Sequence, residues 1–144
     1  MGMVPEAAIA MLACTRIGAL VMGRSTYDWV EAELDRTGMV WPHRQPTWVL
    51  THREPPAVVP DAPIMFTDAP IDAVATAMRS AAGARDCWIV GGGQVATGFA
   101  TAGLLDEVIV AVAPVLLGAG TPIITRSEEH TSELQSPYVS RMPS

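Results

Sequence analysis

Apolar and polar residues follow two different rhythms along this chain. Short continuous apolar or β-branched runs predict strands, because a strand covered on both faces needs apolar side chains at successive positions. These runs lie at residues 17–22, 47–51, 64–66, 86–90 and 107–113, and a further strand can begin at 121–125. Between the runs, apolar residues recur at i, i+3, i+4 and i+7, which predicts helices. The helical segments cover residues 5–15, the stretch after Thr26, 70–82, and the stretch after Gly93.

Two of these helices have a clear apolar face. In the helix that Gly83 ends, the residues expected to face the core are Ile71, Val74, Ala75 and Met78. In the last helix Val95, Phe99 and Ala102 recur at i, i+4 and i+7, as on one face. Because strand and helix alternate, we predict an α/β fold whose sheet is mostly parallel, with helices on both faces.

Composition and charge narrow the class of protein. A chain of 144 residues with 49% hydrophobic residues predicts one folded domain. The net charge of −6 gives no electrostatic reason to expect nucleic acid or an anionic membrane as a partner. The apolar runs are much shorter than the roughly 20 residues of a membrane span. Cys14 and Cys87 fall in predicted elements and are expected to be buried free thiols, although a disulfide between them stays open. We expect a soluble cytoplasmic protein without a metal site.

Three consecutive glycines, Gly91 to Gly93, separate a predicted strand from a predicted helix. Glycines leave the backbone bare, and the free N–H groups of a helix start favour an anion such as phosphate. The alternative is that the turn needs glycine only for its backbone angles. The spacing Gly91-x-Gly93-x-x-Ala96 also fits a dinucleotide fingerprint, but no acidic residue follows the next strand to bind a ribose.

Two further strands end in residues that can contact phosphate. One ends in Gly23-Arg24-Ser25-Thr26 and the other in Thr51-His52-Arg53. Each has a plainer explanation: Ser25 or Thr26 caps a helix while Arg24 is solvated, and Glu54 pairs with Arg53. Because the carboxyl ends of parallel strands share one edge, the three stretches are expected to converge on one ligand.

These stretches, in this order and at these separations, resemble the dihydrofolate reductase superfamily. More narrowly, they resemble the bacterial branch related to the reductase domain of the bifunctional riboflavin-biosynthesis deaminase-reductase. The similar segments are Val21 to Tyr27, Val49 to Arg53, Ile89 to Val95 and Leu104 to Val108, within residues 5–124. The resemblance implies a three-layer, mostly parallel mixed sheet and an NADPH-dependent reductase.

The resemblance also implies which residues hold the NADPH. Residues 23–26 and 91–95 would contact its pyrophosphate and neighbouring groups, and Arg24 with residues 51–53 would surround its 2′-phosphate. The expected cofactor-binding residues are Gly23, Arg24, Ser25, Thr26, Thr51, His52, Arg53, Val90, Gly91, Gly92, Gly93, Gln94 and Val95. Basic groups without a ribose carboxylate favour NADPH over NADH.

The sequence departs from true dihydrofolate reductases at two positions. Their helical carboxylate corresponds to Ala7, with Glu6 beside it, and the tyrosine after their triple glycine is Ala96. Both differences argue against folate reduction and favour the riboflavin-type branch, with a reaction like that of 5-amino-6-(5-phosphoribosylamino)uracil reductase. The substrate is expected to be a heterocycle, either a pyrimidine or riboflavin precursor or a pteridine. The catalytic acid is unknown. Glu6 is a candidate proton donor, with a simple charge in the first helical turn as the alternative.

Two other functions stay open. One is a nucleotide-binding module without catalysis, which the missing acid favours. The other is a flavodoxin-like or Rossmann domain, which the missing ribose acid disfavours. Residues 126–144 resemble a translated sequencing adapter, so we expect a partial reductase domain over 1–125 and a non-native polar tail. The resemblance implies a homodimer for the intact parent.

Overall fold

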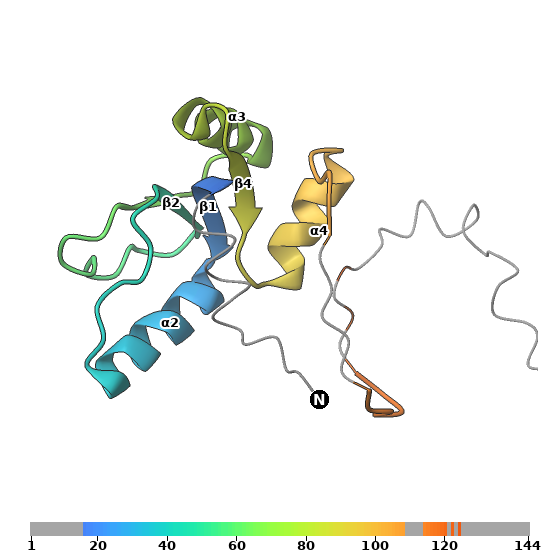
Figure 1. Cartoon of the computed structure of the whole chain (residues 1–144), viewed down its shortest axis with the longest axis horizontal. Coiled ribbons are helices and arrows are strands. Elements are labelled where there is room, and N and C mark those ends of the chain that lie inside the picture. The colour runs from blue at the N-terminus through green and yellow to red at the C-terminus, as the bar shows by residue number, and fades with distance from the viewer. Residues whose placement is uncertain (1–15, 109–113, 121, 123, 125–144) are drawn as a thin grey trace, which may run out of the picture.

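Four strands and three helices make up the described part of the computed structural model, which covers residues 16–108, 114–120, 122 and 124 (Figure 1). In chain order they are β1 (Ile17–Gly23), α2 (Arg24–Thr37), β2 (Thr47–Leu50), β3 (Ile64–Thr67), α3 (Ile71–Ala82), β4 (Asp86–Ile89) and α4 (Gly93–Thr101). Each lies where the sequence predicts it. The helix expected at 5–15 lies outside the described residues, as do most of the strands expected at 107–113 and 121–125.

The four strands form one sheet in the order β3-β2-β1-β4, and every neighbouring pair is parallel. The strand β1 lies inside the sheet, where Val21 is in register with Trp48 of β2 and with Ile89 of β4. The strand order reverses at β1. From β1 the chain continues to β2 and β3 on one side, and it then returns to β4 on the other side of β1. Because all pairs are parallel, all strands end at the same edge of the sheet. The reversal of strand order makes a topological switch point at that edge, between β1 and β4.

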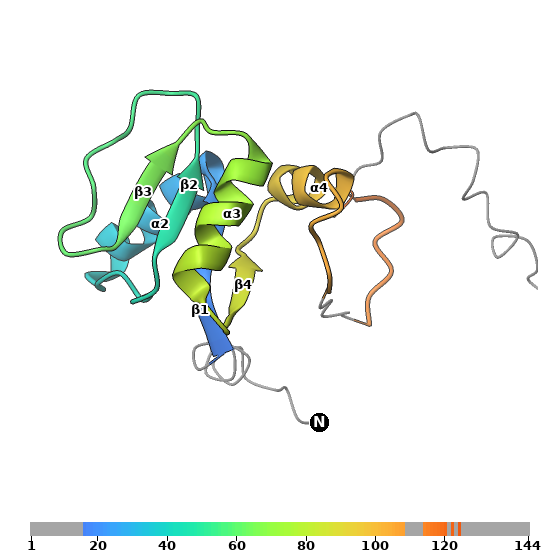
Figure 2. The same cartoon turned by 90° about the horizontal axis from the view of Figure 1, so that it is seen from above.

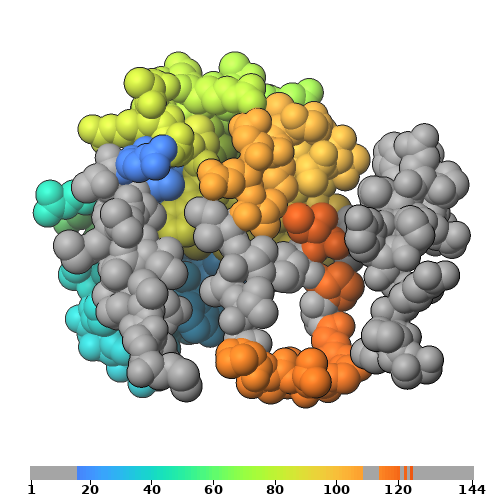
Figure 3. Space-filling model, turned by 45° about the vertical axis from the view of Figure 1, so that its right-hand side comes forward, coloured from blue at the N-terminus to red at the C-terminus, as the bar shows by residue number. Residues whose placement is uncertain are grey.

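Helices cover both faces of the sheet, as Figure 2 shows with α3 on the near side and α2 behind. On one face α3 and α4 bury Val74, Met78 and Phe99 against Val21 and Trp48. In the space-filling view α4 adjoins α3 at the surface (Figure 3). The two buried faces confirm the predicted arrangement of helices on both sides of a parallel sheet.

On the other face, α2 is held to the sheet by Tyr27. The Tyr27 side chain is completely buried with Met22 and Val49, and its ring meets Phe66 edge-on at 5.1 Å between centroids. An edge-on ring pair of this kind contributes roughly 0.5–1.5 kcal/mol to stability in addition to the burial of apolar area. This contact fixes the first turns of α2, and with them Arg24, against the end of β1.

The end of α3 presses on the start of β1. A Cβ added at Gly18 would lie 2.7 Å from the Ala82 Cα and 2.9 Å from its carbonyl oxygen, so only glycine fits there. The pairing of β1 with β4 is irregular between Ile17 and Ala19, around this same glycine.

One expectation about burial is wrong. Cys87 is a free thiol but is exposed, as are its neighbours Asp86 and Trp88 in β4. Ala102 is exposed and follows Thr101, the last residue of α4. Within the described residues, no helix is both long and apolar enough to cross a membrane.

Candidate functional site

Three of the predicted stretches lie at the carboxyl edge of the sheet. Gly23 ends β1 and precedes the first residue of α2, and residues 51–53 follow β2. Residues 90–92 join β4 to α4, whose first turn contains Gln94 and Val95. Val95 is buried in the core, so only its backbone can face a ligand. Glu6 lies outside the described residues.

The two glycine turns meet between β1 and β4. Gly91 has φ +61°, and a Cβ added there would lie 3.1 Å from both Oγ1 and Cγ2 of Thr26. Gly92 has φ +68°, and its added Cβ would lie 3.6 Å from the same Thr26 hydroxyl oxygen. The amide of Val90 donates to the Val21 carbonyl at 2.8 Å and extends the pairing of the two strands up to the turn. The positive φ strongly favours glycine at 91, and the close approach of Thr26 leaves little room for a Cβ.

Two helix N-termini point from this edge without a side-chain cap. The N-cap of α2 is Gly23 and that of α4 is Gly92, and neither helix has a side-chain capping bond or an acidic residue in its first turn. The alternative that Ser25 or Thr26 caps α2 is therefore wrong. The first amides of each helix favour an anion by roughly 0.3–1 kcal/mol per exposed charge. The edge has the polarity expected for phosphate.

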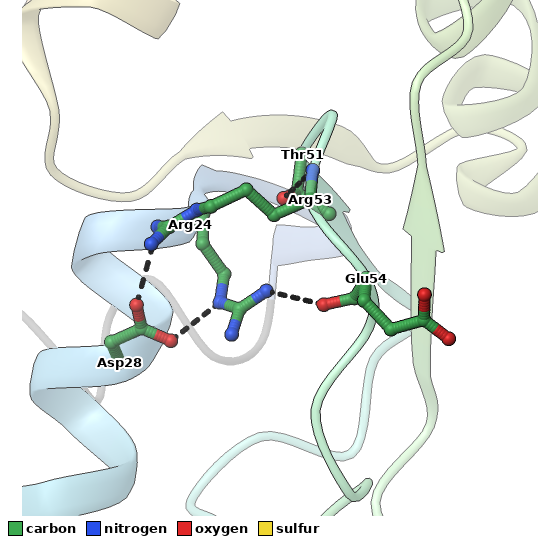
Figure 4. A network of polar contacts seen from close by, with 5 residues as sticks. All are labelled: Arg24, Asp28, Thr51, Arg53 and Glu54. Atoms are coloured by element: carbon green, nitrogen blue, oxygen red, sulfur yellow. Dashed lines mark hydrogen bonds and ion pairs between the residues drawn. The ribbon is translucent and has the colours of Figure 1, made fainter.

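Two arginines from neighbouring strand ends share one carboxylate, as Figure 4 shows. Arg24 Nε donates to Asp28 Oδ1 at 2.6 Å, and its Nη1 donates to the Glu54 carbonyl at 3.0 Å. Arg53 Nη2 lies 3.5 Å from Asp28 Oδ2, and its amide donates to Thr51 Oγ1 at 3.0 Å. The Arg24 side chain is only 17% exposed, so the alternative of a solvated Arg24 is wrong.

Asp28 is the residue at this edge that the sequence argument missed. The apolar pattern predicts this helix only after Thr26, whereas α2 begins at Arg24; Arg24 and Asp28 therefore stand four residues apart on one helix and share a face. The alternative partner considered for Arg53 was the carboxylate of Glu54, but the described ion pair of Arg53 is with Asp28. Glu54 contributes its backbone carbonyl to Arg24 instead.

A cavity of about 310 Å³ opens at the same edge of the sheet, between the ends of β2 and β3. Thr51 and His52 line it together with the start of α3; its walls are Leu50, Thr51, His52, Thr67, Asp68, Ala69, Pro70 and Ile71. The larger cavity, about 400 Å³, lies at the opposite edge beside Gly18 and Arg85 and contains none of the predicted site residues. The smaller cavity is therefore the one that continues the candidate site.

Comparison with known families identifies the chain. The family model of the RibD C-terminal domain matches residues 15–141. The chain belongs to this family. The RibD C-terminal domain is the reductase domain of a riboflavin biosynthesis protein, and its match confirms the resemblance that the two glycine turns indicated.

Two relatives place this RibD C-terminal domain among known proteins. A structure at 2.12 Å resolution, of a Shewanella sp. PV-4 protein assigned to riboflavin biosynthesis, is similar with a TM-score of 0.65 and 26% identity. The similarity covers 87% of this chain and 67% of that one, and it confirms the dihydrofolate reductase-like α/β fold. The uncharacterized protein YwjB of Bacillus subtilis (strain 168) is 27% identical over 107 residues, which are 74% of this chain and 58% of YwjB.

Proposed function

We propose that this chain binds NADPH at the carboxyl edge of the sheet and reduces a heterocyclic substrate. The observation that carries the proposal is the contact between the two glycine turns, where Thr26 lies against the bare backbone of Gly91. That contact brings two uncapped helix N-termini to the switch point of a parallel sheet, the place where this class of fold binds nucleotides.

The residues of this edge fit the chemical groups of NADPH. The amides of the α2 and α4 first turns suit a pyrophosphate, and Gly91 and Gly92 allow it close to the backbone. Arg24 and Arg53 offer guanidinium donors that suit a 2′-phosphate. The cavity between Thr51 and Ile71 has room for a flat ring system. No carboxylate in the sequence occupies the position of a ribose-binding acid, which favours NADPH over NADH.

NADPH supplies the hydride, so the protein has to orient the two rings and bring a proton. Membership in the RibD C-terminal domain family supports a pyrimidine or riboflavin precursor as the substrate class. The second candidate is a nucleotide-binding module without turnover, favoured by the alanine at position 7 and by the lack of an identified proton donor. Oxidation of NADPH on adding a pyrimidine or pteridine substrate would distinguish the reductase from this module.

Cofactor binding can be tested by fluorescence. Trp48 and Trp88 lie on the strands that flank β1, so bound NADPH should quench their emission. Arg53→Ala should weaken NADPH by about tenfold, because a charged hydrogen bond to the 2′-phosphate is lost, and NADH by less than twofold. The matched control is Arg36→Ala, which removes an exposed arginine of α2 that pairs with Glu33 away from the site. Equal losses for both cofactors would contradict the assignment.

A further inference from the structure

The Asp28 carboxylate divides its two oxygens between two arginines from different strand ends. One oxygen accepts from Arg24 at 2.6 Å, and the other faces Arg53 at 3.5 Å. The carboxylate thus brings one negative charge to the pair of guanidiniums that the proposed function assigns to the 2′-phosphate (Figure 4). Two positive charges are reduced to a net single charge at the place where a dianion is expected to bind.

The two contacts differ in strength. Arg24 is largely buried and is also held by the Glu54 carbonyl, whereas the Arg53 side chain is 65% exposed and its contact with Asp28 is long. An exposed ion pair of that geometry contributes little. An incoming phosphate can therefore take Arg53 away from Asp28 without disturbing Arg24. The buried Tyr27 fixes the backbone of α2 beside Asp28, and the bond to Arg24 holds the Asp28 carboxylate.

We propose that Asp28 determines how strongly this site prefers a 2′-phosphorylated dinucleotide, by competing with the phosphate for Arg53 and by repelling it. The proposal rests on the proposed function, since it concerns the same cofactor site. Asp28 is a positioning and specificity residue and takes no part in the chemical step. Its carboxylate keeps Arg24 in place, and its charge lowers the affinity for NADPH relative to NADH.

Asp28→Asn separates these two effects. Asparagine has nearly the shape of aspartate and keeps an oxygen that accepts from Arg24 Nε, but it removes the charge. We expect Asp28→Asn to bind NADPH about fivefold more tightly, because one repulsive charge a few ångströms from a dianion is lost. NADH affinity should change by less than twofold. The NADPH affinity of the variant should also fall more steeply with added salt, since the site then carries more net positive charge.

The experiment measures dissociation constants of NADPH and NADH by tryptophan quenching at two salt concentrations, for the wild-type chain, Asp28→Asn and Glu33→Gln. Glu33→Gln removes the same charge from the same helix, in a pair with Arg36 outside the site, and should leave both constants unchanged. If the wild type binds neither cofactor, the proposed function fails and this inference falls with it. If the wild type binds NADPH but Asp28→Asn binds it equally well or less well, or if Glu33→Gln tightens it equally, only the inference on Asp28 is overturned.

Discussion

Replacing Gly91 by alanine tests the contact on which the candidate site depends. The residue has φ +61°, where a side chain costs about 1–2 kcal/mol. The new Cβ would also lie 3.1 Å from two atoms of Thr26, a β-branched side chain with little freedom in a helix. Overpacking of this kind costs roughly 1–3 kcal/mol. We expect Gly91→Ala to lower the free energy of unfolding by about 2–5 kcal/mol in total.

The two contributions can be separated with a matched variant. Gly103 has φ +70° but no heavy atom within 4 Å of its added Cβ, so Gly103→Ala should show the backbone cost alone. Both variants change the unfolded chain in the same way, and that effect cancels in their difference. Urea unfolding followed by circular dichroism gives each free energy. Adding Thr26→Ala to Gly91→Ala should recover the steric part, with Thr26→Ala alone as the reference. If Gly91→Ala costs no more than Gly103→Ala, the two turns do not touch as described.

Two further predictions concern packing and pH. Gly18→Ala should cost about 1–3 kcal/mol in urea unfolding because its Cβ meets the α3 backbone, whereas Gly98→Ala should be nearly neutral. A Cβ added at Gly98 meets only the flexible tip of Ile71, and alanine is more favourable than glycine in a helix by about 0.5–1 kcal/mol. Equal losses of stability in Gly18→Ala and Gly98→Ala would contradict this prediction. Burial lowers the pKa of His43, so the unfolded chain takes up a proton first as the pH falls below about 6.5. Stability should therefore fall with pH below that value, measured by urea unfolding, and His43→Gln should reduce the slope.

Most of the described fold followed from the sequence because its elements have strong local signals. The apolar run of β1 is typical of a covered strand, and the i, i+3, i+4 and i+7 spacing of α3 is typical of an amphipathic helix. Val74 and Met78 of that helix are buried as expected. The two glycine turns were informative because they also resembled a family, and the family match confirmed that resemblance.

The failures arise where local pattern does not determine tertiary surroundings. Cys87 is followed by the apolar run Trp88-Ile89-Val90, which predicts a strand, but its burial depends on what lies against β4, which spacing cannot tell. The partner of Arg53 depends on how α2 is rotated over the sheet, so Glu54, its neighbour in sequence, was considered and Asp28 was missed. The roles of the predicted cofactor-binding residues stay predictions.

The contact of Thr26 with Gly91 joins strands that are neighbours in the sheet but distant along the chain. Between β1 and β4 come α2, β2, β3 and α3, so the pairing of β1 with β4 is a long-range contact. A nucleotide held by both turns would bind the complete sheet and not one from which β4 has detached. At a hundred times its dissociation constant it would suppress that detachment by about 2.7 kcal/mol. Hydrogen exchange in β4 then becomes a measure of ligand occupancy.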